Sequence, residues 1–170
     1  LRSLDRSLNA VMAEDVGAAL AHMDQALIHP LKAMAYEGHA SGTPSSDLKL
    51  PHIMLVNRHG RRFVNEVAVN MGLAFAERDP ATRQPINLPA WRIFDSQYVR
   101  KYPRVLPVNR TPPGFYTAPS LPELAKMVGV DAGGLVDSAK RMTAFARSGK
   151  DEDFGRGSHY WDVTTIGDPR

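Results

Sequence analysis

The stretch of residues 53–66 limits what this chain can fold into more than any other part of the sequence. It begins with four consecutive apolar residues, Ile53–Val56, which favour a strand and are too few for a helix. A polar loop follows and ends at Gly60, the residue type that adopts a positive φ without strain. Residues 61–65 are then predicted to return as a second extended segment. This pattern predicts a β-hairpin with a short glycine-containing loop.

Sequence patterns elsewhere predict helices and few strands. Apolar residues at helical spacing predict helices over residues 14–28 and 66–78. Residues 31–51 are interrupted by glycine and proline, and we predict that they are irregular. Alternating residues 90–95 predict a strand, followed by a short helical turn over residues 97–102.

The last third of the chain carries clear helix start signals. Ser120 and Glu123 have the spacing of a capping box, which predicts a short helix ending near Val128. Asp131 is predicted to cap a second helix that ends by Gly149. Because helices and strands do not alternate regularly, the sequence predicts an α+β domain with helices packed around a small antiparallel sheet.

Composition narrows the class of protein. The 170 residues are 43% hydrophobic, which suits one domain with its own core. The formal charge of +3 is too small and too scattered to indicate nucleic-acid binding. The sequence has no cysteine, so thiolate catalysis and disulfides are excluded, and no motif predicts a metal site. No apolar run is long enough for a membrane span and no signal peptide is visible, so we expect a cytoplasmic protein.

Two motifs resemble those of a known flavoprotein superfamily. The run Val-Asn-x-x-Gly-x-Arg-Phe-x-Asn-Glu over residues 56–66 resembles a signature in the capping domain of the fumarate reductase and 3-ketosteroid dehydrogenase superfamily. Residues 149–157, followed by Tyr160 and residues 167–169, are similar to the close of that domain, particularly in ketosteroid-dehydrogenase-like members. The resemblance covers residues 12–170. Residues 1–11 do not match and are interpreted as a vector-derived or divergent terminal segment.

The resemblance implies an FAD-dependent enzyme whose cofactor is held mainly by another domain. Such flavoproteins seat the FAD pyrophosphate on a Rossmann-type Gly-x-Gly-x-x-Gly loop. Gly155-Arg156-Gly157 comes nearest to that loop here, but Tyr160 occupies the third glycine position. We therefore expect a separate FAD-binding Rossmann domain of the same full-length protein as the partner, and an inactive chain in its absence.

The resemblance also implies site residues around the hairpin. It places Arg62 and Glu66 at the cofactor and Asn65 at the substrate cavity. A structural alternative is that Phe63 packs in the core while Arg62 and Glu66 form ion pairs or cap backbone groups. Arg156 is predicted to anchor its loop by charge-assisted hydrogen bonds.

Asn70 is the candidate catalytic residue. It stands four residues after Glu66. The resemblance implies a proton-donating arginine at this position in fumarate reductases and a tyrosine in ketosteroid dehydrogenases. An amide cannot exchange protons usefully near neutral pH, but it can donate a hydrogen bond that polarises a substrate carbonyl. The alternative is an exposed helix residue without a catalytic role.

Ser45 and Ser46 are further substrate-binding candidates. They occupy the place of a Thr-Glu pair in the fumarate reductase pattern, and this departure argues against a dicarboxylate substrate. We therefore predict the substrate-capping domain of an FAD-dependent oxidoreductase that dehydrogenates a carbonyl-containing substrate, such as a 3-ketosteroid, by hydride transfer to flavin.

Two other functions remain open at this point. One is the cap of a fumarate or succinate-type flavoprotein, and the other is a free-standing, non-catalytic binding module with the cap fold. The partners expected are the FAD-binding domain and a hydrophobic small molecule. An uncovered apolar face on such a cap would also favour a homo-oligomer.

Overall fold

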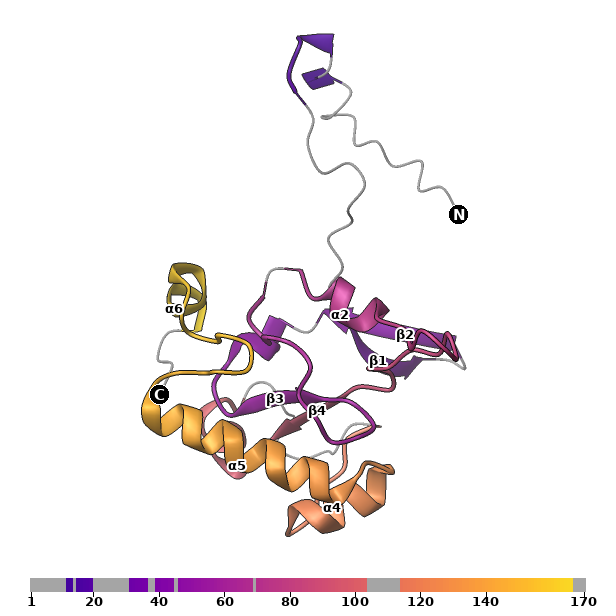
Figure 1. Ribbon diagram of the computed structural model, residues 1–170, viewed down its shortest axis with the longest axis vertical. Helices are drawn as coiled ribbons and strands as arrows, with labels where there is room; N and C mark the ends of the chain where they lie inside the picture. Colours follow the sequence, from indigo (N-terminus) through magenta and orange to yellow (C-terminus); the bar gives the residue numbers. More distant parts are fainter. Residues whose placement is uncertain are drawn as a thin grey trace.

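The computed structural model describes residues 12–13, 15–19, 31–36, 39–44, 46–68, 70–103 and 114–166. Figure 1 shows the helices and strands in this part of the chain. In chain order they are β1 (Leu31–Tyr36), β2 (His39–Pro44), the 3-10 helix η1 (Ser46–Lys49), β3 (Ile53–Val56), α2 (Gly72–Ala76), β4 (Trp91–Phe94), α3 (Ser96–Lys101), α4 (Leu121–Val128), α5 (Ala132–Ser148) and α6 (Tyr160–Ile166).

Strand β3 forms the centre of the fold. All four of its residues are buried, and it pairs antiparallel with β4 from Ile53 opposite Phe94 to Val56 opposite Trp91. Successive side chains point to opposite faces of a strand. Ile53 and Leu55 accordingly pack in one apolar cluster with Leu48, Val64, Met71 and Tyr98, whereas Met54 and Val56 pack in another with Ile93, Ala125, Val130 and Leu135. Burial on both faces explains why the apolar run of β3 is unbroken.

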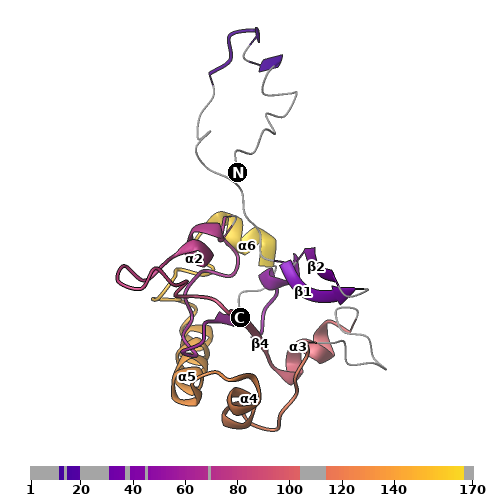
Figure 2. The same ribbon diagram turned by 90° about the vertical axis from the view of Figure 1, so that its right-hand side faces the viewer.

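Helices α4 and α5 cover one side of this strand pair, and α2 and α6 lie toward the other end of the molecule in both views (Figures 1 and 2). The predicted caps are confirmed. The Ser120 hydroxyl accepts a hydrogen bond from the Glu123 N–H at 3.4 Å, and the Asp131 carboxylate accepts from the N–H groups of Gly133 and Gly134. Helix α5 ends before Gly149, which has a φ of 74°.

The loop after β3 lies directly against the start of α5. Gly60 has a φ of 67°, and a Cβ there would come within 2.2 Å of the Leu135 nitrogen. A Cβ on Gly134 would come within 2.0 Å of the His59 oxygen. The Ser138 hydroxyl donates to the Gly60 oxygen at 2.7 Å. Glycine is therefore required on both sides of this contact.

Two predictions about strands are wrong. Residues 61–65 form no second strand, since Val56 and Arg62 make a single bridge and β3 pairs instead with β4. Residues 31–51 are not irregular, because β1 and β2 form an antiparallel hairpin from Leu31 opposite Pro44 to Tyr36 opposite His39. A proline at the end of a two-stranded hairpin is compatible with strand structure. The described fold is α+β with two separate two-stranded sheets rather than one.

Two predicted helices also differ from the structure. The helix over residues 66–78 is reduced to α2, because Asn65 and Asn70 each accept a hydrogen bond from the N–H two residues ahead and form turns instead. The helix over residues 14–28 lies mostly outside the described residues, and residues 16–19 are a turn and irregular chain. Within the described residues, none of the helices has the length and apolar character needed to cross a membrane.

Candidate functional site

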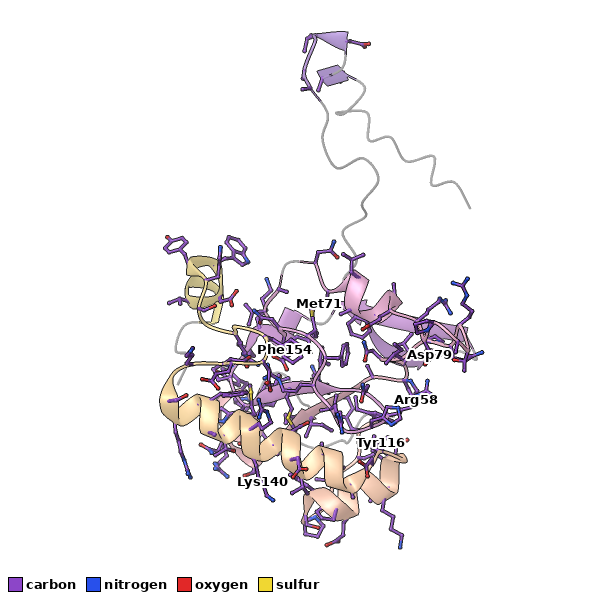
Figure 3. All side chains as sticks on the ribbon, viewed as in Figure 1. Arg58, Met71, Asp79, Tyr116, Lys140 and Phe154 are labelled. Atoms are coloured by element: carbon purple, nitrogen blue, oxygen red, sulfur yellow. The ribbon has the colours of Figure 1, made fainter. Side chains whose placement is uncertain are left out.

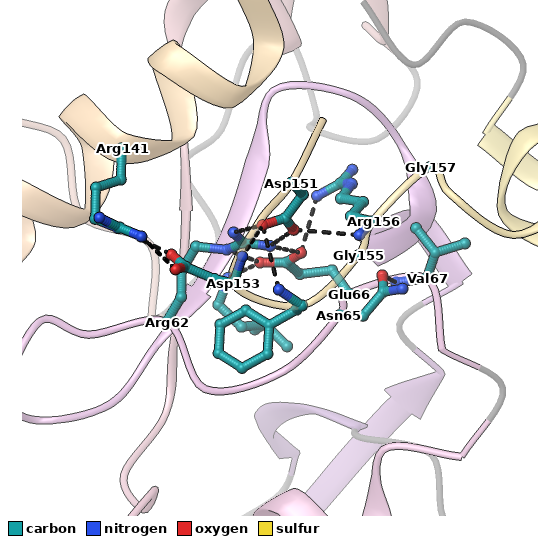
Figure 4. Close-up of polar contacts among 12 residues, drawn as sticks. Arg62, Asn65, Glu66, Val67, Arg141, Asp151, Asp153, Gly155, Arg156 and Gly157 are labelled. Atoms are coloured by element: carbon teal, nitrogen blue, oxygen red, sulfur yellow. Dashed lines mark hydrogen bonds and ion pairs between the residues drawn. The ribbon is translucent and has the colours of Figure 1, made fainter. Parts of the chain in front are cut away.

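A buried network of four charged side chains joins the motif around residue 62 to the loop before α6 (Figure 4). Arg62 donates from Nε and Nη2 to the two Glu66 oxygens at 3.0 and 2.9 Å. It also donates from Nη1 and Nη2 to the Asp151 oxygens at 3.3 and 2.9 Å. The side chains of Arg62, Glu66 and Asp151 are 4%, 0% and 4% exposed. The guanidinium therefore bridges two carboxylates inside the protein.

Arg156 is the fourth member of the network. Its Nη1 donates to the Ile53 oxygen at 2.8 Å and to Glu66 Oε2 at 3.1 Å, and its Nη2 donates to the Leu50 oxygen at 2.9 Å. The Leu55 N–H donates to Glu66 Oε1 at 3.1 Å. These contacts confirm that Arg156 anchors its loop to β3. Two guanidinium groups and two carboxylates together have no net formal charge.

Charge pairing keeps Arg62 and Asp151 ionised. Burial acts to raise the pKa of Asp151, but the hydrogen bond and charge of Arg62, with backbone donors at Asp153 and Phe154, lower it overall. Burial acts to lower the pKa of Arg62, and its hydrogen bonds and charge interactions with Glu66 and Asp151 raise it overall. Both groups are therefore charged at neutral pH.

The charged ends of Arg62 and Glu66 are hydrogen-bonded within this chain. The Glu66 oxygens accept from the Leu55 N–H, from two Arg62 nitrogens and from Arg156. Neither Arg62 nor Glu66 presents its charged end to the surface, because both side chains are buried. Their structural alternative, a buried ion pair with a backbone contact, is what the geometry shows. A cofactor-binding role for either stays a prediction.

An open hollow of about 430 Å³ lies beside this network. We name it the α6 groove. Its described lining comes from the turn at residues 65–68 and from residues 154–162, which include the start of α6. The lining residues are Asn65, Ala68, Phe154, Gly155, Ser158, His159, Trp161 and Asp162. Figure 3 places Phe154 below α6, between that helix and the centre of the molecule.

Hydrogen bonds join the two walls of the α6 groove. Asn65 Nδ2 donates to Asp162 Oδ2 at 3.0 Å, and the Gly157 N–H donates to the same oxygen at 3.0 Å. Asp162 is 4% exposed. The Arg62 guanidinium lies 5.2 Å from the centre of the Phe154 ring, which links the groove to the charged network. Asn65, predicted to bind substrate, therefore lies in a hollow with an ordered wall.

Among the other predicted site residues whose side chains the structure describes, Arg62, Glu66 and Asn70, none lines this groove. Asn70 is exposed, and its Oδ1 accepts from the Gly72 N–H at 3.1 Å just before α2. The helix predicted to carry Asn70 begins only at Gly72, so the predicted helical register of Asn70 is wrong. The catalytic role of Asn70 stays a prediction. Ser45 lies outside the described residues. Ser46 begins η1, and its side chain lies outside the described part.

Sequence reasoning missed several residues of the site. Asp151 was part of the second motif, yet nothing in the sequence indicated that it would pair with Arg62. His159, Trp161 and Asp162 follow the glycine-containing loop, and the aromatic run at residues 159–161 was the available signal for a groove. Among the residues that the structure describes, no group of three histidine, aspartate or glutamate side chains is placed to hold a metal ion.

Comparisons with known proteins relate the chain to two kinds of oxidoreductase. No family model matches the chain. It is 34% identical over 172 residues to the 3-oxosteroid 1-dehydrogenase of Mycobacterium tuberculosis strain H37Rv, covering 92% of this chain and 29% of that protein. It is 31% identical over 151 residues to a fumarate reductase (cytochrome) of Shewanella frigidimarina, covering 85% of this chain and 24% of that protein.

Solved structures give the same result. A 3-ketosteroid Δ1-dehydrogenase from Sterolibacterium denitrificans, crystallised with 1,4-androstadiene-3,17-dione, matches with a TM-score of 0.68 and 30% identity over 90% of this chain. The open conformation of a flavocytochrome c3 fumarate reductase matches with a TM-score of 0.57 and 25% identity over 86% of this chain.

The chain belongs to the 3-ketosteroid dehydrogenase and fumarate reductase superfamily. Its relatives there are oxidoreductases, which supports its being part of an enzyme. The chain spans less than a third of the length of the curated relatives it matches, with 29% of the 3-oxosteroid 1-dehydrogenase covered.

Proposed function

We propose that this chain is the substrate-capping domain of an FAD-dependent oxidoreductase that dehydrogenates a ring ketone. One observation carries the proposal: 90% of the chain superposes on 29% of a 3-ketosteroid Δ1-dehydrogenase chain. The remaining part of such an enzyme would hold the flavin, which supplies the redox chemistry when bound. This chain would form one wall of the substrate cavity and exclude water from it.

Ring ketones are the substrate class that the comparisons favour. The names of two relatives specify an oxo group on a ring: 3-oxosteroid 1-dehydrogenase and the 4-oxocyclohexanecarboxylate 2-dehydrogenase of Sinomonas cyclohexanicum, which is 38% identical over 117 residues. In sequence, Asn70 stands where the resemblance expects an arginine in a dicarboxylate reductase, although α2 begins only after Asn70 and does not give it the expected helical register. An amide can donate a hydrogen bond to a ketone oxygen but cannot deliver a proton near neutral pH.

The test uses this chain and the longer protein encoded around it. We expect the longer protein to purify yellow with FAD and to reduce an artificial electron acceptor when a 3-oxosteroid or a cyclohexanone carboxylate is added. The isolated chain should be colourless and inactive. Fumarate, with a reduced dye as electron donor, serves as the competing substrate.

Three results would contradict the proposal. Tight FAD binding by the isolated chain would show that it is more than a cap. A longer protein that never holds flavin would favour a non-catalytic binding module. Turnover of fumarate but of no ring ketone would favour the fumarate-reductase-like cap instead.

A further inference from the structure

Asp162 has one carboxylate oxygen that the protein leaves without a hydrogen bond. Its Oδ2 accepts from Asn65 Nδ2 and from the Gly157 N–H, both at 3.0 Å. Within the part of the chain that the structure describes, Oδ1 accepts from no donor. The residue as a whole is only 4% exposed. Because an unsatisfied carboxylate oxygen is costly, the surroundings of Oδ1 indicate what could supply a donor.

Oδ1 of Asp162 meets solvent in the α6 groove. Among the residues that the structure describes, the one fully buried side-chain polar atom without a hydrogen-bond partner is Nε2 of His52. Oδ1 of Asp162 is therefore not sealed inside the protein. Since Asp162 lines the α6 groove and is otherwise buried, Oδ1 faces that groove.

The rest of the groove is largely apolar. Ala68, Phe154 and Trp161 supply apolar and aromatic surface. Phe154 and Trp161 are 36% and 48% exposed, so both present ring surface to solvent. The hydroxyl of Ser158, another lining residue, already donates to the Gly155 oxygen at 2.6 Å. Sites for small molecules typically combine such apolar surface with a few placed polar groups.

The charges around the groove favour a ligand that is uncharged and donates a hydrogen bond. An anion or a carbonyl oxygen would bring an electron-rich atom against the Asp162 carboxylate. A cation would compete with cations of the protein, because the Arg62 guanidinium lies 5.2 Å from the centre of the Phe154 ring. The Lys49 amine likewise lies 6.0 Å from the centre of the Trp161 ring. A hydroxyl group satisfies both conditions.

We propose that the α6 groove is a binding site for an uncharged alcohol. The hydrocarbon part of the ligand lies against Phe154 and Trp161, and its hydroxyl donates to Oδ1 of Asp162. This site goes beyond the proposed function, because it requires no flavin and selects a hydrogen-bond donor, whereas the oxygen of a ring ketone can only accept.

Three ligands of the same size test the donor. They are 2-decalol, the matching ketone 2-decalone and the methyl ether of 2-decalol, of which only the alcohol can donate a hydrogen bond. Binding to the unchanged chain is measured by NMR titration of the tryptophan indole N–H signals. The chain has two tryptophans, so Trp161→Phe identifies the signal of the groove. We expect the alcohol to bind about tenfold more tightly than the ketone or the ether, the ratio expected for one hydrogen bond to a charged group.

Substitution of Asp162 should reverse this preference. In Asp162→Asn the amide oxygen can still accept from Asn65 and Gly157, which leaves the amide nitrogen as a donor in the place of Oδ1. The ketone and the ether should then bind at least as tightly as the alcohol. Asp137→Asn is the matched control, because Asp137 is 76% exposed on α5 and its substitution removes the same formal charge outside the groove. Phe154→Ala should weaken all three ligands together. Circular dichroism checks the folding of each variant.

Several outcomes would overturn the inference. Equal affinity of the unchanged chain for the three ligands would exclude the hydrogen bond to Asp162, and this comparison requires no variant to fold. A preference for the alcohol that survives in Asp162→Asn would place the acceptor elsewhere. Tighter binding of protonated 2-aminodecalin than of the alcohol would make the ligand a cation. Alcohol binding by this chain but not by the longer protein would show that other polypeptide covers the groove there. Flavin binding and ring-ketone turnover do not enter these measurements, so the inference and the proposed function can fail separately.

Discussion

Glu66 is the residue on which the buried charges depend. It is fully buried and accepts hydrogen bonds from Arg62, Arg156 and the Leu55 backbone. Glu66→Gln keeps the shape of the side chain but leaves two guanidinium groups with one carboxylate. We expect the free energy of unfolding to fall by about 3–5 kcal/mol, as when one partner of a buried pair is removed. Urea denaturation followed by circular dichroism measures the change.

The control for Glu66→Gln is the more exposed pair of Arg141 and Asp153, whose side chains are 58% and 28% exposed. Asp153→Asn should change the stability far less, because solvent screens exposed charges. Equal losses for Asp153→Asn and Glu66→Gln would show that burial does not strengthen the network.

Asp151 should make the stability depend on pH in the acid range. Its pKa in the folded chain is lowered, since Arg62 and backbone donors outweigh the effect of burial. The stabilisation from a lowered pKa is complete above the unfolded-state value of about 3.9 and is lost as the pH falls through the folded value. Urea titrations from neutral to acid pH should therefore show a loss of stability below about pH 4. The Asp151→Asn variant should be less stable than the unchanged chain at neutral pH. Its stability should also decrease less as the pH falls below about 4.

Asp137→Asn is the matched control for the acid dependence. Asp137 is 76% exposed on α5, and its substitution removes the same formal charge without touching the network. The stability of the Asp137→Asn variant should decrease in acid as steeply as that of the unchanged chain. If the Asp151→Asn variant also loses stability in acid as steeply as the unchanged chain, the pH dependence belongs to other carboxylates.

At the level of elements, the contact between the residue 57–60 loop and α5 is the most sensitive to added volume. Gly134→Ala would place a methyl group within 2.0 Å of the His59 oxygen, and overpacking of this kind costs about 1–3 kcal/mol. At Gly133 the nearest atoms are the Asp131 carboxylate oxygens at 3.8 and 3.9 Å. Gly133→Ala should be neutral or stabilising, because alanine favours helix. Thermal unfolding of the two variants checks this, and matching melting temperatures would disprove the close contact.

Local signals in the sequence were enough to place some elements and not others. Helices α4 and α5 were predicted because their caps, Ser120 and Asp131, act within a few residues. The partner of β3 was predicted wrongly, because β3 pairs with the distant strand β4 rather than with the segment that follows its own loop. The helical pattern over residues 66–78 was overridden by the turns at Asn65 and Asn70.

The candidate site shows the same division between local and long-range contacts. The pairing of Arg62 with Glu66 was available from their spacing of four residues. The contacts of Arg62 with Asp151 and of Asn65 with Asp162 join distant parts of the chain. Nothing in a single sequence specifies such pairs, and they are what forms the groove.

At the scale of the whole molecule, α2 and α6 lie toward the same end (Figure 2), and both helices carry large apolar side chains that are exposed. Leu73 is 76% exposed, and Tyr160, Trp161 and Val163 on α6 are 80%, 48% and 42% exposed. Exposed apolar surface of this kind indicates an interaction site. Because the relatives are more than three times as long as the matched region, we propose the FAD-binding domain of the longer protein as its occupant. The alternative occupant is a second copy of this chain, and homo-oligomerisation stays a prediction.

Thiol labelling can identify this occupant, because the chain has no cysteine of its own. We predict that Leu73→Cys and Val163→Cys react rapidly with a maleimide in the isolated chain and at least tenfold more slowly in the longer protein, since burial excludes the reagent. Met127→Cys is the control: Met127 is 53% exposed on α4, at the opposite end, and should react equally in both. Peptide mass spectrometry reads the rates at each position. Dilution of the isolated chain separates the alternative, because protection by a second copy decreases with concentration whereas protection within one polypeptide does not. Unchanged reactivity of both positions in the longer protein would mean that this surface faces solvent there.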